Sequence, residues 1–466
     1  MKKMQINNFK EAVYYEKLEN GLEIYLVPLN KKNGYYTAFG TKYGGRDIKF
    51  KVDGQLKETP TGIAHFLEHK LFEKEPDPFT FYQKSGTDVN ASTSHDFTSY
   101  YIYGNKNYKQ NLIYLLNWLQ NLNITKELVE KEQGIILEEA SMYKDNPDRV
   151  MNNKIKENVF VKDSIRNKVI GTDEDIVKIT KEDLELCYKS FYNPENMFII
   201  SVGKINPKEI MEIIKENTKD FKSVKEIEKY YEEEPDDIYK EYEEVYFNVD
   251  IPRVTSAYKF NKKKFNKLDI DKFSLDLYIH ILINTGIGIT SDIREKWLKE
   301  ELFISSSYKV TETETHYVIE FNATSNKIDE LVKELDNYLK DIKITKESFE
   351  REKKLWIAGE VKTISNINGT AYNILDDILD YGKFIPNKID YIRNLDYETL
   401  LKIKEVLVFN KRAVVKLLPK ENEWKIVRFL FFFWKTYKLN ISVVVVLVNL
   451  IIRLCWIFYF QYMFLL

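Results

Sequence analysis

A short segment combines two histidines and a glutamate at a spacing that can hold a metal ion. Residues 61–72 read TGIAHFLEHKLF and contain His65, Glu68 and His69. On an α-helix, positions i and i+4 lie one turn apart on the same face, and i+3 is their neighbour. Two imidazoles placed in this way can reach one Zn²⁺ at roughly 2.0–2.1 Å. The adjacent carboxylate can then act on a water molecule at the metal. The alternative is a pair of surface histidines beside a solvated glutamate.

A second segment offers the carboxylate that such a site still needs. A catalytic zinc usually has three protein ligands and one open position. Residues 130–143 read EKEQGIILEEASMY. In a helix, Glu132 and Glu139 share a face because they are two turns apart, whereas Glu138 is rotated by about 100° from Glu139. Local spacing therefore leaves the choice between Glu138 and Glu139 open, and without the first motif the segment would be an ordinary solvated helix.

The elements around these segments alternate between strand and helix patterns. Strand-like runs at 22–28 and 35–43 are separated by turn residues and predict a hairpin. A helix is expected to begin near Pro60, with Thr61 as its N-cap. The Thr-, Ser- and Tyr-rich stretch 89–103 predicts a strand or hairpin, and 108–122 and 125–144 have helical periodicity.

An internal repeat indicates a duplicated chain. Residues 180–203 and 396–418 each read as a helix, an Asn-containing turn and a buried strand, with an offset of about 216 residues. We therefore expect an α+β fold with two homologous domains, each a mostly antiparallel sheet with helices packed on one face. The expected divisions are a domain with the two-histidine motif at 1–221, an acidic linker at 222–243, a homologous domain without a paired motif at 244–425, and a tail at 426–466.

Composition excludes several classes of protein. The chain has 466 residues, with 70 basic and 72 acidic side chains. Without a basic excess, a general nucleic-acid binder is not expected. Two cysteines exclude a disulfide scaffold and fit a reducing compartment. The N-terminus has no apolar run of signal-peptide type, so a cytoplasmic location is expected.

The C-terminal tail differs from the rest of the chain. Residues 426–466 carry four basic and no acidic side chains, and 23 of the 28 residues from 439 to 466 are apolar. About 20 apolar residues span a bilayer as a helix, although Arg453 interrupts this run. A membrane-contacting segment that tethers the protein, a buried element and an accidental extension of the gene all stay open.

These motifs resemble the pitrilysin/insulinase/mitochondrial processing peptidase superfamily of zinc metallopeptidases. His65, Glu68 and His69 match its inverted zinc motif, H-x-x-E-H. The pattern E-x-x-x-I-x-x-E from Glu132 to Glu139 matches its second metal helix. The resemblance implies one Zn²⁺ per chain, held by His65, His69 and Glu139, with Glu132 as a supporting acid and Glu68 as the catalytic base.

The resemblance also implies a substrate strand, an activity and a partner. Residues 86–100 are similar to the edge strand on which the family binds peptides, with Asn90, Ala91 and Ser92 where the peptide backbone is held. The implied activity is that of a zinc-dependent endopeptidase, in a homodimer or in a heterodimer with a homologous subunit that lacks the motif. The chain is most similar to a bacterial subgroup associated with 5-aminopentanol modification of elongation factor P. A non-proteolytic peptide-binding or assembly subunit of such a modification pathway is the alternative.

Overall fold

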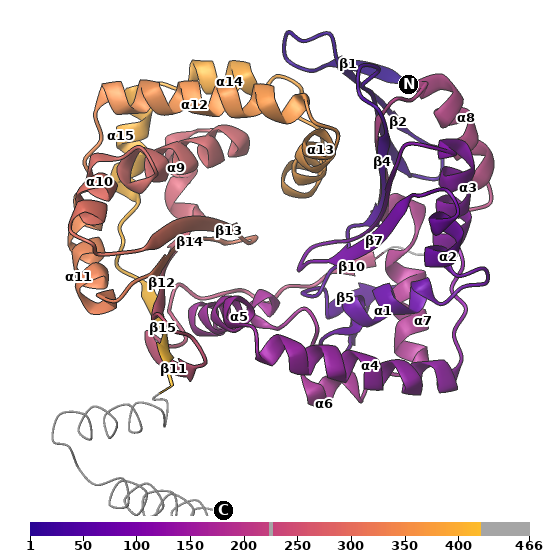
Figure 1. Ribbon diagram of the computed structural model, residues 1–466, viewed down its shortest axis with the longest axis horizontal. Helices are drawn as coiled ribbons and strands as arrows, with labels where there is room; N and C mark the ends of the chain where they lie inside the picture. The colour runs from indigo at the N-terminus through magenta and orange to yellow at the C-terminus, as the bar shows by residue number, and fades with distance from the viewer. Residues whose placement is uncertain (223–226, 421–466) are drawn as a thin grey trace, which may run out of the picture.

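The computed structural model describes residues 1–222 and 227–420, which form two α+β halves that face each other (Figure 1). The predicted tail at 426–466 lies outside the described residues. Within these residues one stretch, Lys272–Lys299, is long and apolar enough to cross a membrane, but 61% of its most apolar window is buried. It is a core element of the second half.

A seven-stranded sheet organises the first half. The predicted hairpin between 22–28 and 35–43 is wrong, because β9 lies between β3 and β4, parallel to β3 and antiparallel to β4. Every residue of β9 (MFIISVG) is buried, so this strand is stabilised best in the middle of the sheet. The strands, in sheet order, are β1 (Lys2–Gln5), β2 (Ala12–Lys17), β3 (Glu23–Pro28), β9 (Met197–Gly203), β4 (Tyr35–Thr41), β8 (Thr98–Gly104) and β7 (Asp88–Thr93).

Helices of the first half cover one face of this sheet (Figure 1). The predicted helices are present, but Thr61 is not the N-cap of α1. Gly62 occupies that position with φ 89°, and a Cβ there would lie 2.4 Å from the carbonyl oxygen of Ile170. The helices are α1 (Ile63–Phe72), α2 (Pro78–Gln83), α3 (Tyr108–Leu119), α4 (Lys126–Lys144), α5 (Pro147–Val159), α6 (Asp173–Ile176), α7 (Lys181–Phe191) and α8 (Pro207–Thr218).

The second half repeats this topology. In the first sheet the last strand lies between the third and fourth strands and is parallel to the third, and in the second sheet the last strand lies between the first two and is parallel to the first. All other neighbouring strands in both sheets are antiparallel. The strands, in sheet order, are β11 (Tyr242–Phe247), β15 (Arg412–Pro419), β12 (Arg253–Asn261), β14 (His316–Thr324) and β13 (Ser305–Glu312). The helices are α9 (Lys272–Ile287), α10 (Asp292–Lys299), α11 (Ile328–Leu339), α12 (Lys346–Ile364), α13 (Ile367–Tyr381), α14 (Lys388–Asn394) and α15 (Tyr397–Val406).

The two halves exchange one helix each. α5, from the first half, packs on β12 and β15 of the second, while α13 packs on β4 and β9 of the first (Figure 1). Ile155 and Val159 of α5 join Val415 in one buried cluster, and Ile374 of α13 joins Ile200 in another. Each half's own helices therefore cover one face of its sheet, as predicted, and a helix of the other half covers the opposite face.

The acidic segment at 222–243 is tied to both halves. β10 (Ile227–Lys229) extends a small sheet with β5 (Lys49–Val52) and β6 (Gln55–Glu58). Glu234 is buried, accepts hydrogen bonds from the backbone N–H groups of residues 161–163 and pairs with Lys259. Residues 227–243 are thus docked on both halves, although the acidic composition predicts a solvated linker, while the proposed domain divisions stay a prediction.

Candidate metal centre

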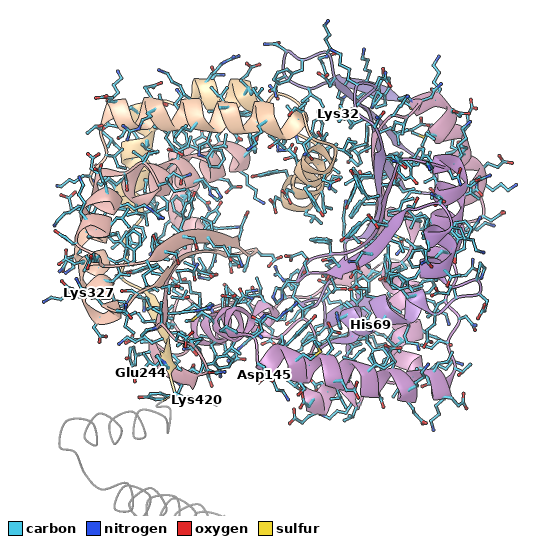
Figure 2. All side chains as sticks on the ribbon, in the orientation of Figure 1. Lys32, His69, Asp145, Glu244, Lys327 and Lys420 are labelled. Carbon is cyan, nitrogen blue, oxygen red and sulfur yellow. The ribbon has the colours of Figure 1, made fainter. Side chains whose placement is uncertain are left out.

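Helices α1 and α4 bring the predicted ligands together, and Figure 2 labels one of them, His69, in the first half. The rings of His65 and His69 have centroids 4.6 Å apart. Glu139 Oε2 lies 3.7 Å from His65 Nε2 and 3.4 Å from His69 Nε2. One ligand atom from each of the three side chains lies within 4.8 Å of the others. Of the two carboxylates that spacing leaves open, Glu139 faces the imidazoles and Glu138 is exposed. Two imidazoles and one carboxylate form a donor set that suits Zn²⁺.

Glu132 contacts His69 on the side of the ring that faces away from Glu139. Its Oε1 accepts a hydrogen bond from His69 Nδ1 at 3.0 Å, and Lys70 Nζ lies 3.7 Å from its Oε2. Burial raises the pKa of Glu132, but the hydrogen bond from His69 and the charge of Lys70 outweigh burial, so the pKa lies below its usual range. An ionised acceptor on Nδ1 leaves Nε2 of His69 directed at Glu139, which is the arrangement that metal-ligating histidines use.

The pKa values of the two histidines are shifted in opposite directions. Burial, together with the neighbouring His69, lowers the pKa of His65 to about 4, so this ring is neutral. Burial also lowers the pKa of His69, but the carboxylates of Glu132 and Glu139 reverse the effect and raise it to about 9. A metal ion bound by His69 must therefore displace a proton, because the ligand is the neutral imidazole.

Glu68 is connected to the edge strand. Its Oε2 accepts a hydrogen bond from the hydroxyl of Thr93, the last residue of β7. Burial raises the pKa of Glu68, although the hydrogen bond from Thr93 opposes this shift. A carboxylate with a raised pKa is suited to take up and release a proton near neutral pH.

Strand β7 has one unoccupied edge. Among the described strands it pairs only with β8, at the end of the sheet order. Asn90 and Ser92 are exposed, whereas Ala91 packs against the core of the first half. A free row of backbone N–H and C=O groups can bind an extended peptide as an additional strand. The predicted contact of Asn90, Ala91 and Ser92 with a peptide is compatible with this placement and stays a prediction.

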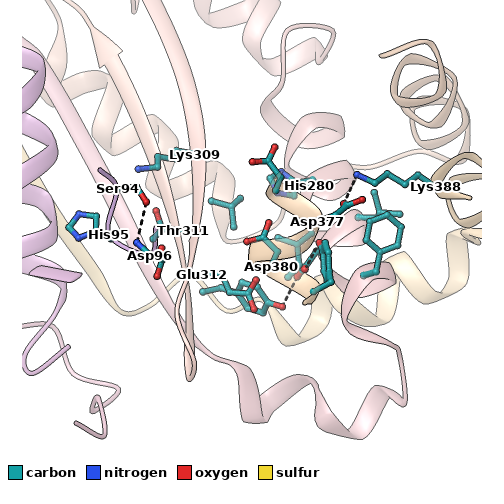
Figure 3. Close-up of a pocket in the computed structure, with 18 of the residues that line it drawn as sticks. Ser94, His95, Asp96, His280, Lys309, Thr311, Glu312, Asp377, Asp380 and Lys388 are labelled. Atoms are coloured by element: carbon teal, nitrogen blue, oxygen red, sulfur yellow. Dashed lines mark hydrogen bonds and ion pairs between the residues drawn. The ribbon is translucent and has the colours of Figure 1, made fainter. Parts of the chain in front are cut away.

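A cavity of about 480 Å³ begins where β7 ends (Figure 3). The first half contributes Ser94 and His95 to its lining, and the second half contributes carboxylates that include Asp276 and Asp380. Burial, with the nearby charge of Glu312, raises the pKa of Asp276 to about 6 and that of Asp380 to about 7. The proposed metal ligands do not line this cavity, which adjoins their site through the end of β7.

Tyr143 and Arg149 belong to the site although the motifs do not include them. The Tyr143 hydroxyl donates a hydrogen bond to Glu139 Oε1. The guanidinium carbon of Arg149 lies 3.4 Å from the centroid of the Tyr143 ring. The available signal is the i, i+4 spacing of Glu139 and Tyr143, which places both on one face of α4.

Comparisons with known proteins agree with this fold. The "Uncharacterized zinc protease YmfH" of Bacillus subtilis is 31% identical over 434 residues, which cover 90% of this chain and all of that protein. Residues 51–173 match "Insulinase (Peptidase family M16)" and residues 178–355 match the "Peptidase M16 inactive domain". The chain belongs to peptidase family M16. The predicted superfamily is confirmed.

Solved structures share the two-domain architecture. An M16-like peptidase from Alicyclobacillus acidocaldarius superimposes with a TM-score of 0.83 at 29% identity, over 89% of this chain and 99% of that one. A protease from Helicobacter pylori superimposes with a TM-score of 0.74 at 21% identity, over 88% of this chain and 100% of that one. These matches confirm the predicted α+β fold with two sheet-containing domains.

Proposed function

We propose that the protein is a zinc-dependent endopeptidase that cleaves peptides or small proteins. The observation that carries this proposal is the convergence of His65, His69 and Glu139 within 4.8 Å, with Glu68 one residue before a ligand and on the same helix. Relatives named as zinc proteases support it.

Each residue has a distinct part in the proposed reaction. His65, His69 and Glu139 would hold zinc, which supplies Lewis acidity and lowers the pKa of water. Glu68 takes a proton from the attacking water and later delivers it to the leaving amine. Glu132 holds His69 in the orientation that binds metal.

The substrate is proposed to bind as an additional strand. An extended peptide on the free edge of β7 would pass Asn90, Ala91 and Ser92 and reach Thr93, whose hydroxyl contacts Glu68. The cavity beyond β7 gives the peptide room to continue between the two halves (Figure 3).

We also propose a paired assembly, either a homodimer or a heterodimer with a homologous subunit that lacks the zinc motif. The "Mitochondrial-processing peptidase subunit beta" of Dictyostelium discoideum, 29% identical over 195 residues, is named as one subunit of an enzyme. Light scattering of the purified chain, alone and with a candidate homologue, measures the assembly directly. A monomer with full activity would argue against the pairing.

Substitution of Glu68→Gln tests the reaction. Removal of the general base should lower kcat by roughly 10²–10⁴-fold, because this is the usual contribution of acid–base catalysis. Cleavage of a fluorogenic peptide library, with and without a chelator, measures the activity, and zinc affinity should not change. Glu138→Gln, an exposed position on α4, is the matched control.

Two results would contradict the proposal. If the Glu68→Gln protein cleaves at the rate of the unmodified protein, Glu68 is not the base. If the unmodified protein binds zinc but shows no chelator-sensitive cleavage, alone or with its partner, a peptide-binding or assembly role is favoured instead.

A further inference from the structure

The two oxygens of the Glu139 carboxylate have different neighbours. Oε2 faces Nε2 of both His65 and His69, at 3.7 and 3.4 Å. Oε1 instead accepts the hydrogen bond from the Tyr143 hydroxyl. The carboxylate is therefore oriented, with one oxygen bound by the phenol and the other directed at the histidines.

The phenol is itself held in place. Its ring packs against the apolar core of the first half, and the Arg149 guanidinium lies over the ring at 3.4 Å from its centroid. A cation over the face of an aromatic ring is attracted by the ring quadrupole. The ring is therefore packed between the core and the guanidinium, with its hydroxyl directed at Glu139. α5 begins at Pro147, so Arg149 lies in the first turn of the helix that crosses to the second half.

The arrangement matches the support of another proposed ligand. Glu132 holds His69 through the ring nitrogen that points away from the site, and Tyr143 holds Glu139 through the oxygen that points away from it. His65 differs, because its buried Nδ1 has no hydrogen-bond partner within residues 1–222 and 227–420. Glu132, Glu139 and Tyr143 all project from one face of α4.

We propose that Tyr143 is a positioning residue for the third metal ligand, and that Arg149 fixes the ring of Tyr143. This inference rests on the proposed zinc site. Tyr143 keeps Oε1 occupied and so presents Oε2 to the metal, which reduces the reorganisation that Glu139 undergoes on binding. The second half supports this role, because the residues 220 positions later are Thr363 and Gly369. The Tyr–Arg pair is therefore absent from the second half, where the residue that corresponds to Glu139 is Gly359.

The decisive experiment is a zinc titration of the Tyr143→Phe protein in competition with a chromophoric chelator. Loss of an outer-shell partner typically lowers metal affinity by about 10–100-fold, and we expect a loss in this range. The visible absorption of the Co²⁺-substituted protein should also change, since the carboxylate can then bind through either oxygen. Tyr188→Phe is the matched control, because the Tyr188 hydroxyl bonds the Leu119 carbonyl in the same half, away from the ligands.

A second pair of variants keeps the inference testable if Tyr143→Phe folds poorly. Arg149→Met removes the cation and should weaken zinc binding less than Tyr143→Phe, while Arg149→Lys should restore part of the loss. Wild-type zinc affinity and an unchanged Co²⁺ spectrum in Tyr143→Phe would overturn the inference. An unmodified protein that binds no zinc would overturn it together with the proposed function. If the unmodified protein binds zinc but cleaves nothing, only the peptidase proposal fails, because the affinity measurement is independent of cleavage.

Discussion

Helices α4 and α12 occupy the same place in the two halves, and of these two helices only α4 carries a proposed metal ligand. Both contain 19 residues and begin after threonine N-caps that are 220 residues apart. At this offset Glu132 corresponds to Glu352, whereas Glu139 corresponds to Gly359. Both retained glutamates are buried. The buried glutamate is thus present in both halves, whereas the proposed ligand, Glu139, is present in the first half alone.

The retained glutamate has a different partner in each half. Glu132 accepts from the ring of His69, whereas Glu352 accepts from the indole Nε1 of Trp356 at 3.1 Å. His280 of α9 packs near Trp356, and burial lowers the pKa of His280 to about 4. Across the described ranges, the first half holds the one group of residues placed to bind a metal. A buried carboxylate requires a donor, and a tryptophan can satisfy it without creating a metal site.

Replacement of Glu139 by the glycine that stands at the corresponding position of the second half should have the largest effect, on zinc affinity. Glu139→Gly gives the first half the residue of the second, and it should weaken zinc binding by more than the about 10–100-fold that loss of an outer-shell partner costs. Peptide cleavage should be lost with the metal. Zinc titration measures the loss, and Glu139→Gln separates it from the helix destabilisation of about 1 kcal/mol that glycine brings.

The reverse exchange, Gly359→Glu, is the control for that comparison. A side chain at this position meets no atom within 4 Å of its Cβ, so the substitution should be tolerated. It should create no second zinc site, because no histidine pair faces it. A second zinc per chain would show that the ligand position alone distinguishes the halves.

The exchanged helices should give the next largest effect. Ile374 of α13 and Ile155 of α5 are both buried against the sheet of the other half. Each Ile→Ala substitution should lower the free energy of unfolding by about 2–5 kcal/mol. Chemical denaturation followed by tryptophan fluorescence measures this, with the more exposed Ile113→Ala as control. An Ile374→Ala protein as stable as the control would contradict the exchange.

The caps of the exchanged helices should give the smallest effect. The Asn146 side chain accepts from the backbone N–H groups of Asp148 and Arg149, whereas Asn366 accepts from Gly369 alone. Each Asn→Ala substitution should cost about 0.5–2 kcal/mol. Thermal unfolding should show the larger loss for Asn146→Ala. A larger loss for Asn366→Ala would mean that the number of capped N–H groups does not decide the stability of these helices.

Local pattern predicted the pieces of this molecule better than their arrangement. The i, i+4 spacing of His65 and His69 predicted a shared face, and the strand or hairpin expected at 89–103 is formed by β7 and β8. The insertion of β9 between β3 and β4 pairs residues more than 150 positions apart, which no local pattern encodes. The amphipathic character of α5 shows that one face is buried, but not that the sheet of the other half buries it.

Some residues of the site could be predicted only from the family resemblance, and others could not be predicted from the sequence. Spacing could not choose between Glu138 and Glu139, because both lie on a helix whose rotation about its axis is set by tertiary packing. Tyr143 was missed although it lies one turn after Glu139, since a tyrosine is no usual zinc ligand. A stronger sign of duplication was also present in the sequence, because residues 124–127 and 344–347 both read ITKE. The roles assigned to the site residues and the domain divisions stay predictions.

Because α5 and α13 are exchanged, each half completes part of the buried core of the other. Each half lends a helix to its counterpart and receives the equivalent helix in return, which is the relationship between the subunits of a domain-swapped dimer. Two of the four buried apolar clusters draw residues from both halves. The face of the first sheet that α13 covers is therefore completed only by the second half, so the half that holds every proposed ligand shares its core with a half that holds none.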